Sequence, residues 1–216
     1  MTEFKTQAKR EDYFGRNYDT VERFISYYYQ SYCVLQFKNI KKVLEVGIGN
    51  MTLTNYLRQH DLDVTTCDYG IDLKPDYVAD IRNLPMGNNE FDASLAFEIL
   101  EHIPFSDFEK GLNQLARVSR NYVIISVPNS TSYVEFKMKY SFPKLRRKKL
   151  YWKLQIPDFL TTQGEGNHYW ELNRRGYPVN RIRNSIKKCG LEIIKEFEPE
   201  LHNHHHFFIM KKIRET

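Results

Sequence analysis

The sequence lacks several features that would assign it to a special class of protein. No stretch approaches the roughly 18 consecutive apolar residues that a transmembrane helix requires. The first residues contain no apolar run of the kind found in secretory signals, so we expect no such signal. The three cysteines, Cys33, Cys67 and Cys189, are far apart, odd in number and outside any metal-ligand spacing. They predict free thiols in a reducing, cytoplasmic environment.

Repeats, low-complexity tracts and Gly/Ser linkers are also absent, which favours one domain over residues 1–216. Apolar residues make up 41% of the chain and aromatic residues 14%, which is enough for a core and argues against disorder. Charge is distributed unevenly, because residues 136–153 contain eight Lys and Arg and no acid. Since the whole chain carries +5, the remainder carries −3, so the basic character is local.

Apolar periodicity predicts strands that alternate with helices, as in a parallel sheet with crossover helices. The expected strands are 41–46, 63–68, 77–81, 91–97 and 122–128, and the expected helices are 51–60, 108–118 and 179–189. An amphipathic helix is expected from Asp19 to Phe37. Its apolar residues are Val21, Phe24, Ile25, Tyr28, Tyr32 and Leu35. Residues 191–198 and 205–212 predict a closing strand pair.

Residues 43–50, VLEVGIGN, place two glycines between an apolar strand and a helix. Ligands of open α/β sheets bind at this end of the strands, where glycines let the backbone approach closely. A dinucleotide loop needs a third glycine where Thr52 stands. Glu45, just before the loop, would repel a pyrophosphate and could pair with an amino group, while Asp68 ends the next strand where a carboxylate can bind ribose hydroxyls. S-adenosylmethionine has a ribose and an amino group and no phosphate.

With these motifs the sequence resembles the class I S-adenosylmethionine-dependent methyltransferases, of the small ubiquinone-type or methyltransferase-11-like kind. The resemblance covers about 40–128 and 168–212, and rests on VLEVGIGN, CDYG, ADIRNLPMGNNEFD and SLAFEILEHIP. It implies a Rossmann-like, doubly wound, mostly parallel seven-stranded sheet with an antiparallel C-terminal strand and an N-terminal helix.

The resemblance also implies a cofactor site. Its residues are Glu45, Gly47, Gly49, Asp68, Tyr69, Asp80, Ile81, Phe97 and Glu98, with Asp80 and the Ile81 amide at the adenine. The family usually has a further glycine where Met51 stands, so the Met51 side chain is expected close to the methionine tail of the cofactor.

His102 and His168 are the candidate catalytic bases. His102 follows a strand at the mouth of the site, and an unperturbed histidine titrates near neutrality. If residues 98–102 are helical, Glu98, Glu101 and His102 share one face and could hold a divalent ion, with His168 as a fourth ligand. This pattern resembles the metal motif of small-RNA 2′-O-methyltransferases, but we predict no metal. The histidines at 202 and 204–206 are expected on a surface strand edge.

Residues 129–170 predict an insertion, rich in basic and aromatic side chains, that roofs the acceptor pocket. Residues 1–39 are expected to contribute a helical lid, with Tyr13, Phe14 and Tyr18 over the cofactor. The insertion could bind an anionic small molecule, RNA or an anionic membrane, or be a solvated helix.

The sequence thus predicts a methyltransferase acting on an O or N atom of a small acceptor, with anionic and sugar-like molecules as candidates. An RNA methyltransferase and a non-catalytic cofactor-binding domain remain alternatives. Glu45 and Thr52 argue against an NAD-dependent oxidoreductase. The identity of the acceptor and the oligomeric state do not follow from the sequence.

Overall fold

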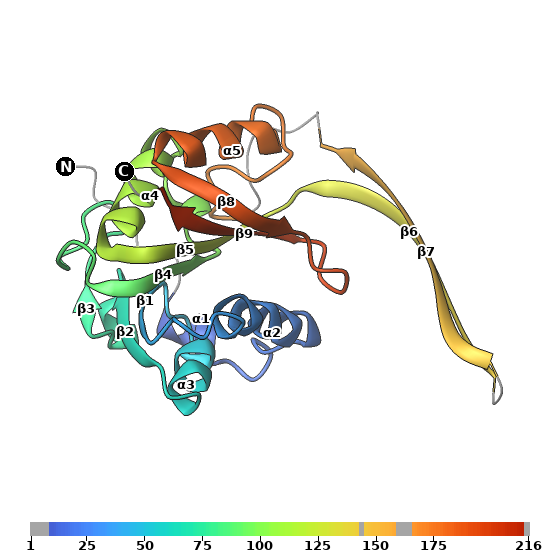
Figure 1. The fold of residues 1–216 in the computed structure, drawn as a ribbon, viewed down its shortest axis with the longest axis horizontal. Coiled ribbons are helices and arrows are strands. Elements are labelled where there is room, and N and C mark those ends of the chain that lie inside the picture. The colour runs from blue at the N-terminus through green and yellow to red at the C-terminus, as the bar shows by residue number, and fades with distance from the viewer. Residues whose placement is uncertain (1–8, 143–144, 159–165, 214–216) are drawn as a thin grey trace.

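A seven-stranded sheet forms the centre of the protein (Figure 1). The computed structural model describes residues 9–142, 145–158 and 166–213. Its strand order is β3-β2-β1-β4-β5-β9-β8. The strands are β1 (Lys42–Val46), β2 (Asp63–Asp68), β3 (Tyr77–Val78), β4 (Phe91–Phe97), β5 (Ser119–Pro128), β8 (Leu191–Phe197) and β9 (His205–Lys212). Only β9 pairs antiparallel with its neighbours, so the predicted sheet is confirmed.

Helices cover both faces of this sheet. The helices are α1 (Arg10–Phe14), α2 (Val21–Leu35), α3 (Thr52–Gln59), α4 (Phe108–Val118) and α5 (Val179–Lys188). Buried side chains of α4 and α5 form one core cluster with one face of the sheet, and those of α2 and α3 form a second cluster with the other. None of the helices in the described ranges combines the length and apolar character of a membrane span.

Helix α2 is oriented opposite to what its apolar pattern predicts. It begins at the N-cap Thr20, whose hydroxyl accepts a hydrogen bond from the Arg23 amide. Its buried residues are Ser26, Gln30, Ser31, Cys33 and Val34. Four of the six predicted apolar residues are instead exposed: Val21, Phe24, Tyr28 and Tyr32. The polar buried side faces the site, where Ser26 and Gln30 find hydrogen-bond partners.

The insertion is a β-ribbon, so the expectation of a solvated helix is wrong. β6 (Thr131–Phe142) and β7 (Leu145–Pro157) pair antiparallel with each other in a separate two-stranded sheet. In Figure 1 this ribbon extends away from the body of the protein. The insertion is also shorter than predicted, because Trp170 is fully buried in the core against Phe105 and Phe108.

Candidate functional site

The glycine loop after β1 is hydrogen-bonded to Asp68 at the end of β2. The Asp68 carboxylate accepts hydrogen bonds from the amides of Ile48 (2.9 Å) and Gly70 (2.7 Å). Gly47 has φ +84°, and a β-carbon there would lie 2.0 Å from the Ile99 side chain. Only glycine fits this turn without a clash, because the Ile99 side chain packs against the place where a β-carbon would lie.

Met51 occupies a left-handed backbone position, with φ 63° and ψ 17°, as the N-cap of α3. This conformation explains why glycine is favoured at this place in related loops. The Met51 side chain does not line the cavity described below, whereas Asn50 and Thr52 on either side do. Met51 is therefore not among the described residues that would border a ligand in this cavity.

Glu45 is buried within the sheet, 4% exposed, and its carboxylate borders the cavity. The Thr54 hydroxyl donates a 2.6 Å hydrogen bond to its Oε2 atom. Burial raises the pKa of Glu45 from 4.5 to about 7, against the effects of Thr54 and Arg58. A cationic group arriving in the cavity would offset this cost of burying a negative charge.

The residues expected at the adenine and ribose also line the cavity: Tyr69, Asp80, Ile81 and Phe97. Arg82 binds Asp80 through its side chain and its amide, and a second ion pair of 2.6 Å joins Arg82 to Asp107. These hydrogen bonds outweigh burial and lower the pKa of Asp80. Asp80 is therefore a fixed, ionised acceptor at the cavity wall.

Residues 98–102 do not form the predicted α-helix. Glu98 has a positive φ of 56°, and only Leu100–His102 forms a short 3₁₀ turn. Glu98 pairs with His205, whose Nε2 lies 3.3 Å from Glu98 Oε2. Burial raises the pKa of Glu98 to about 8.

Glu101, His102 and His168 nevertheless lie together, with one potential ligand atom of each within 4.8 Å of the others. Glu101 is fully buried, and neither of its carboxylate oxygens accepts a hydrogen bond from any described residue. The rings of His102 and His168 are 4.9 Å apart. Burial, reinforced by His168, lowers the pKa of His102 to about 4. His102 can therefore offer a neutral imidazole to a proton or a cation.

Glu171 positions His168, a connection that the sequence did not reveal. His168 Nδ1 lies 2.8 Å from Glu171 Oε1, and Arg174 Nε lies 2.7 Å from Glu171 Oε2. The hydroxyl of Ser130 also donates to this carboxylate. A proton on Nδ1 is thereby favoured, and Nε2 is left as the accepting nitrogen. The only sequence signal for this contact is that Glu171 follows His168 by three residues in HYWE, and this spacing alone carries little information.

The histidines near the C-terminus do not lie on a sheet edge, because β9 pairs with β5 on one side and β8 on the other. His202 and His205 line the cavity, and Ser26 Oγ lies 3.0 Å from His205 Nδ1. His206 is buried on the opposite side near Glu198. Sequence analysis therefore missed two site residues: His205, at the start of β9 between β5 and β8, and His202, in the loop before β9.

Two of the three predicted lid aromatics cover the glycine loop. The Tyr13 ring lies 3.6 Å from the position of a β-carbon on Gly49, and the Tyr18 hydroxyl lies 3.8 Å from it. The two rings pack edge to face with centroids 5.4 Å apart. Phe14 is about half exposed and does not line the cavity.

The predicted cofactor residues and the histidines at 102, 168, 202 and 205 line one cavity of about 580 Å³. Its charged lining is mainly acidic: Glu22, Glu45, Asp68, Asp80, Glu98 and Glu101, with Arg23 as its only Lys or Arg among the described residues. Of the predicted insertion, Asn167 and His168 line the cavity, whereas no described side chain of the β6–β7 ribbon does, so the described part of the ribbon does not roof the pocket. The side chains of 139–149, which include most of the basic run, lie outside those that the structure describes.

Replacing Asp68 with Ala is expected to weaken binding of S-adenosylmethionine by about 1–3 kcal/mol, or about 5- to 150-fold in Kd. The change removes the acceptor of the Ile48 and Gly70 amides and the group expected to bind the ribose. Isothermal calorimetry measures the effect. Asp72→Ala is the matched control, since Asp72 is exposed and lies outside the cavity. Equal affinities of the two variants would contradict the role of Asp68.

Known proteins resemble this chain in sequence and in fold. A family model described as a methyltransferase domain matches residues 44–125, and no curated protein sequence matches the chain. A Burkholderia thailandensis 1,6-didemethyltoxoflavin-N1-methyltransferase with S-adenosylhomocysteine bound is 13% identical, with TM-score 0.64 over 94% of this chain and 84% of its own. The Synechocystis magnesium protoporphyrin IX methyltransferase with bound S-adenosylmethionine is 13% identical, with TM-score 0.62 over 94% and 89%. A sugar N-methyltransferase from a Streptoalloteichus species is 11% identical, with TM-score 0.59 over 94% and 91%.

Proposed function

We propose that this chain, a class I S-adenosylmethionine-dependent methyltransferase by its domain match and its fold, methylates an oxygen or nitrogen atom of a small polar acceptor. The observation that supports this proposal is the cavity. The acids at the ends of β1 and β2 line one part of it, and histidines from three distant segments line another. The first part suits the cofactor, and the second suits the acceptor. We expect the enzyme to act in the cytoplasm.

The cofactor is expected to lie across the carboxyl ends of β1, β2 and β3. Its amino group would approach Glu45, and its ribose hydroxyls would approach Asp68. Asp80 and the Ile81 amide are the proposed partners of the adenine. The sulfonium carries the reactive methyl group, and the protein contributes position and electrostatics.

The acceptor is better described as neutral or cationic than as anionic. An anionic acceptor would find little positive charge, because Arg23 is the only Lys or Arg that lines the cavity among the described residues, and no described side chain of the β6–β7 ribbon reaches it. Hydroxyl or amino groups, as on a sugar, would find acceptors at Glu98 and His205. This revises the anionic candidate, which rested on the insertion alone.

His168 is the proposed general base when the group that receives the methyl is a hydroxyl or a protonated amine. Glu171 accepts a hydrogen bond from His168 Nδ1, so His168 Nε2 is the atom that accepts the proton. The Glu171 carboxylate also stabilises the imidazolium that forms when His168 takes up the proton. In-line attack on the methyl carbon then needs only that the acceptor atom lies within reach. His102, kept neutral by burial, is suited to orient the acceptor by a hydrogen bond.

A divalent ion is the competing explanation of the same cluster. It is favoured by Glu101, because a buried carboxylate without a hydrogen-bond donor needs a proton or a cation. We keep the prediction that transfer does not require a metal, since burial already raises the pKa of Glu101 well above its usual range. Activity lost in EDTA and restored by Mg²⁺ or Mn²⁺ would instead assign Glu101, His102 and His168 to a metal.

A methylation screen tests the proposed function. The chain is first titrated with S-adenosylmethionine by calorimetry, and binding in the micromolar range is expected. It is then incubated with methyl-labelled cofactor and pools of amino sugars, hydroxylated small molecules and RNA, in EDTA and in Mg²⁺. Labelling of a small molecule supports the proposal, whereas labelling of RNA alone favours the RNA methyltransferase. Binding without any transfer favours a non-catalytic domain.

A further inference from the structure

One face of the β6–β7 ribbon is apolar and open to solvent. Residues paired across the two strands share a face, which places Val134 beside Leu154, Phe136 beside Trp152, and Met138 beside Leu150. We define the arm face as Val134, Phe136, Met138, Leu150, Trp152, Leu154 and Ile156, each of which is 43–62% exposed. An isolated two-stranded ribbon is marginally stable in water, so an apolar face of this size indicates a missing partner.

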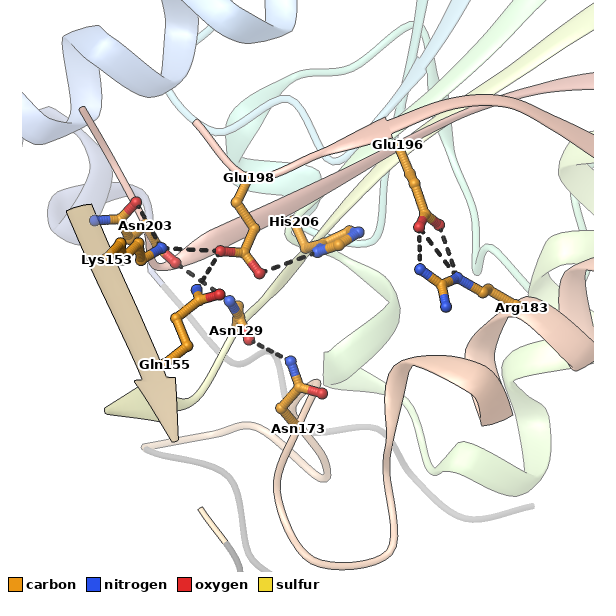
Figure 2. A network of polar contacts seen from close by, with 9 residues as sticks. All are labelled: Asn129, Lys153, Gln155, Asn173, Arg183, Glu196, Glu198, Asn203 and His206. Atoms are coloured by element: carbon orange, nitrogen blue, oxygen red, sulfur yellow. Dashed lines mark hydrogen bonds and ion pairs between the residues drawn. The ribbon is translucent and has the colours of Figure 1, made fainter. Parts of the chain in front are cut away.

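Near the body of the protein, the other face of the ribbon contacts residues 198–203, between β8 and β9. Lys153 binds Glu198 and Asn203, each at 3.1 Å, and Gln155 donates to Glu198 (Figure 2). Lys137 Nζ lies 3.3 Å from the Glu200 carbonyl oxygen. These contacts orient the ribbon by its polar face and leave the arm face turned outward.

A second apolar surface runs along α2. We define the helix stripe as Val21, Phe24, Tyr28 and Tyr32, which recur at helical spacing and are 40–72% exposed. The stripe is the side of α2 that the sequence predicts to be buried. Within the described residues of one chain it stays largely uncovered, so it too indicates a partner.

The two surfaces match in length, and their charges are compatible. The helix stripe spans 12 residues, from Val21 to Tyr32, or about 16 Å for 11 steps of 1.5 Å. The arm face spans Leu150 to Ile156, or about 20 Å at 3.3 Å per residue. Residues 136–153 carry eight positive charges and no acid, whereas α2 carries Glu22 and Arg23 and is net neutral, so an arm meets no net positive charge on α2. Arms stacked on each other would instead bring two basic segments together.

We propose that the chain forms a two-fold dimer by exchanging arms, with the arm face of each copy covering the helix stripe of the other. Such a contact is isologous and closes the assembly at two copies. Half-exposed side chains of this size expose roughly 100 Å² each, so the eleven residues of two symmetric contacts would bury roughly 2,000 Å². Stable interfaces bury about 1,200–2,000 Å². The opposite side of α2 lines the cavity through Arg23, Ser26 and Gln30, so the partner's arm would support a wall of the site.

Analytical ultracentrifugation of the full chain tests this proposal. Twice the mass of one chain is expected, and the double variants Phe136→Ser/Trp152→Ser and Phe24→Ser/Tyr28→Ser should each raise the dimer dissociation constant at least about 100-fold. Tyr133→Ser/Tyr151→Ser, on the polar face of the ribbon, is the matched control and should remain dimeric. Circular dichroism and cofactor binding check that each variant is folded.

Mixing the arm variant with the helix variant separates arm exchange from other arrangements. The mixed pair keeps one intact contact, so a mixture should form more dimer than either variant alone. A helix variant that stays dimeric would overturn the proposal in favour of arm-to-arm stacking. A monomeric parent chain would also overturn it, and its arm-dependent sedimentation with phosphatidylserine vesicles would then assign the arm face to a membrane surface.

Discussion

Replacing His168 with Asn is expected to lower kcat by about 10²- to 10⁴-fold, the usual contribution of a positioned proton acceptor. The Asn amide can still donate to Glu171 from the place of Nδ1, but it offers no nitrogen in the place of Nε2. The variant should therefore keep its local structure and lose only proton transfer. Single-turnover assays with the acceptor found in the screen measure the effect.

Two comparisons make the His168 result specific. Glu171→Gln should lower kcat by less, because it removes the charge that orients and stabilises the ring while leaving the ring itself. His204→Asn is the matched control, since His204 is exposed and does not line the cavity. Affinity for S-adenosylmethionine should be unchanged in all three variants. An unchanged kcat in His168→Asn would remove this residue from the mechanism.

Replacing Glu45 with Gln is expected to stabilise the folded protein and to weaken its binding of S-adenosylmethionine. Between pH 4.5 and about 7 the folded protein keeps a proton on Glu45 that the unfolded chain has released, because the folded pKa is raised. The free energy of unfolding therefore falls as the pH rises through this window. Gln does not titrate and can still accept from Thr54. Above pH 7 the variant should be more stable by up to about 3 kcal/mol, and near pH 4.5 the difference should vanish.

Cofactor affinity should change in the opposite sense. The charged hydrogen bond between Glu45 and the amino group contributes about 1.5–3 kcal/mol, so Glu45→Gln should raise Kd about 10- to 150-fold at pH 8. In the parent protein the affinity should fall as the pH drops below about 7, because Glu45 then takes up a proton. Urea unfolding and calorimetry at several pH values measure both effects. Glu192→Gln on β8, at an exposed position, is the control and should change neither.

Much of the fold follows from local sequence pattern. The boundaries of β2, β4 and α4 agree with the predicted ones, because each has a clear period and is bounded by polar or turn residues. The residues expected at the cofactor come together for a similar reason. Gly47, Gly49 and Asp68 stand at fixed places relative to strand ends, and parallel strands bring those ends to one edge of the sheet.

Contacts between distant segments decided the rest. The strand order puts β9 between β5 and β8, which turns His205 toward Glu98 from 107 positions away in the chain. A positive φ at Glu98 breaks the helix that would have joined it to Glu101.

The sequence by itself determined the elements of the main sheet and the glycine loop, and it predicted the class of cofactor, because these depend on neighbouring residues and on where strands end. Only the tertiary structure decided which face of α2 is buried, that the β6–β7 ribbon stays out of the described cavity lining, and which histidines meet. Those outcomes depend on packing free energies summed over residues far apart in the chain, and a local apolar period does not encode what it will pack against.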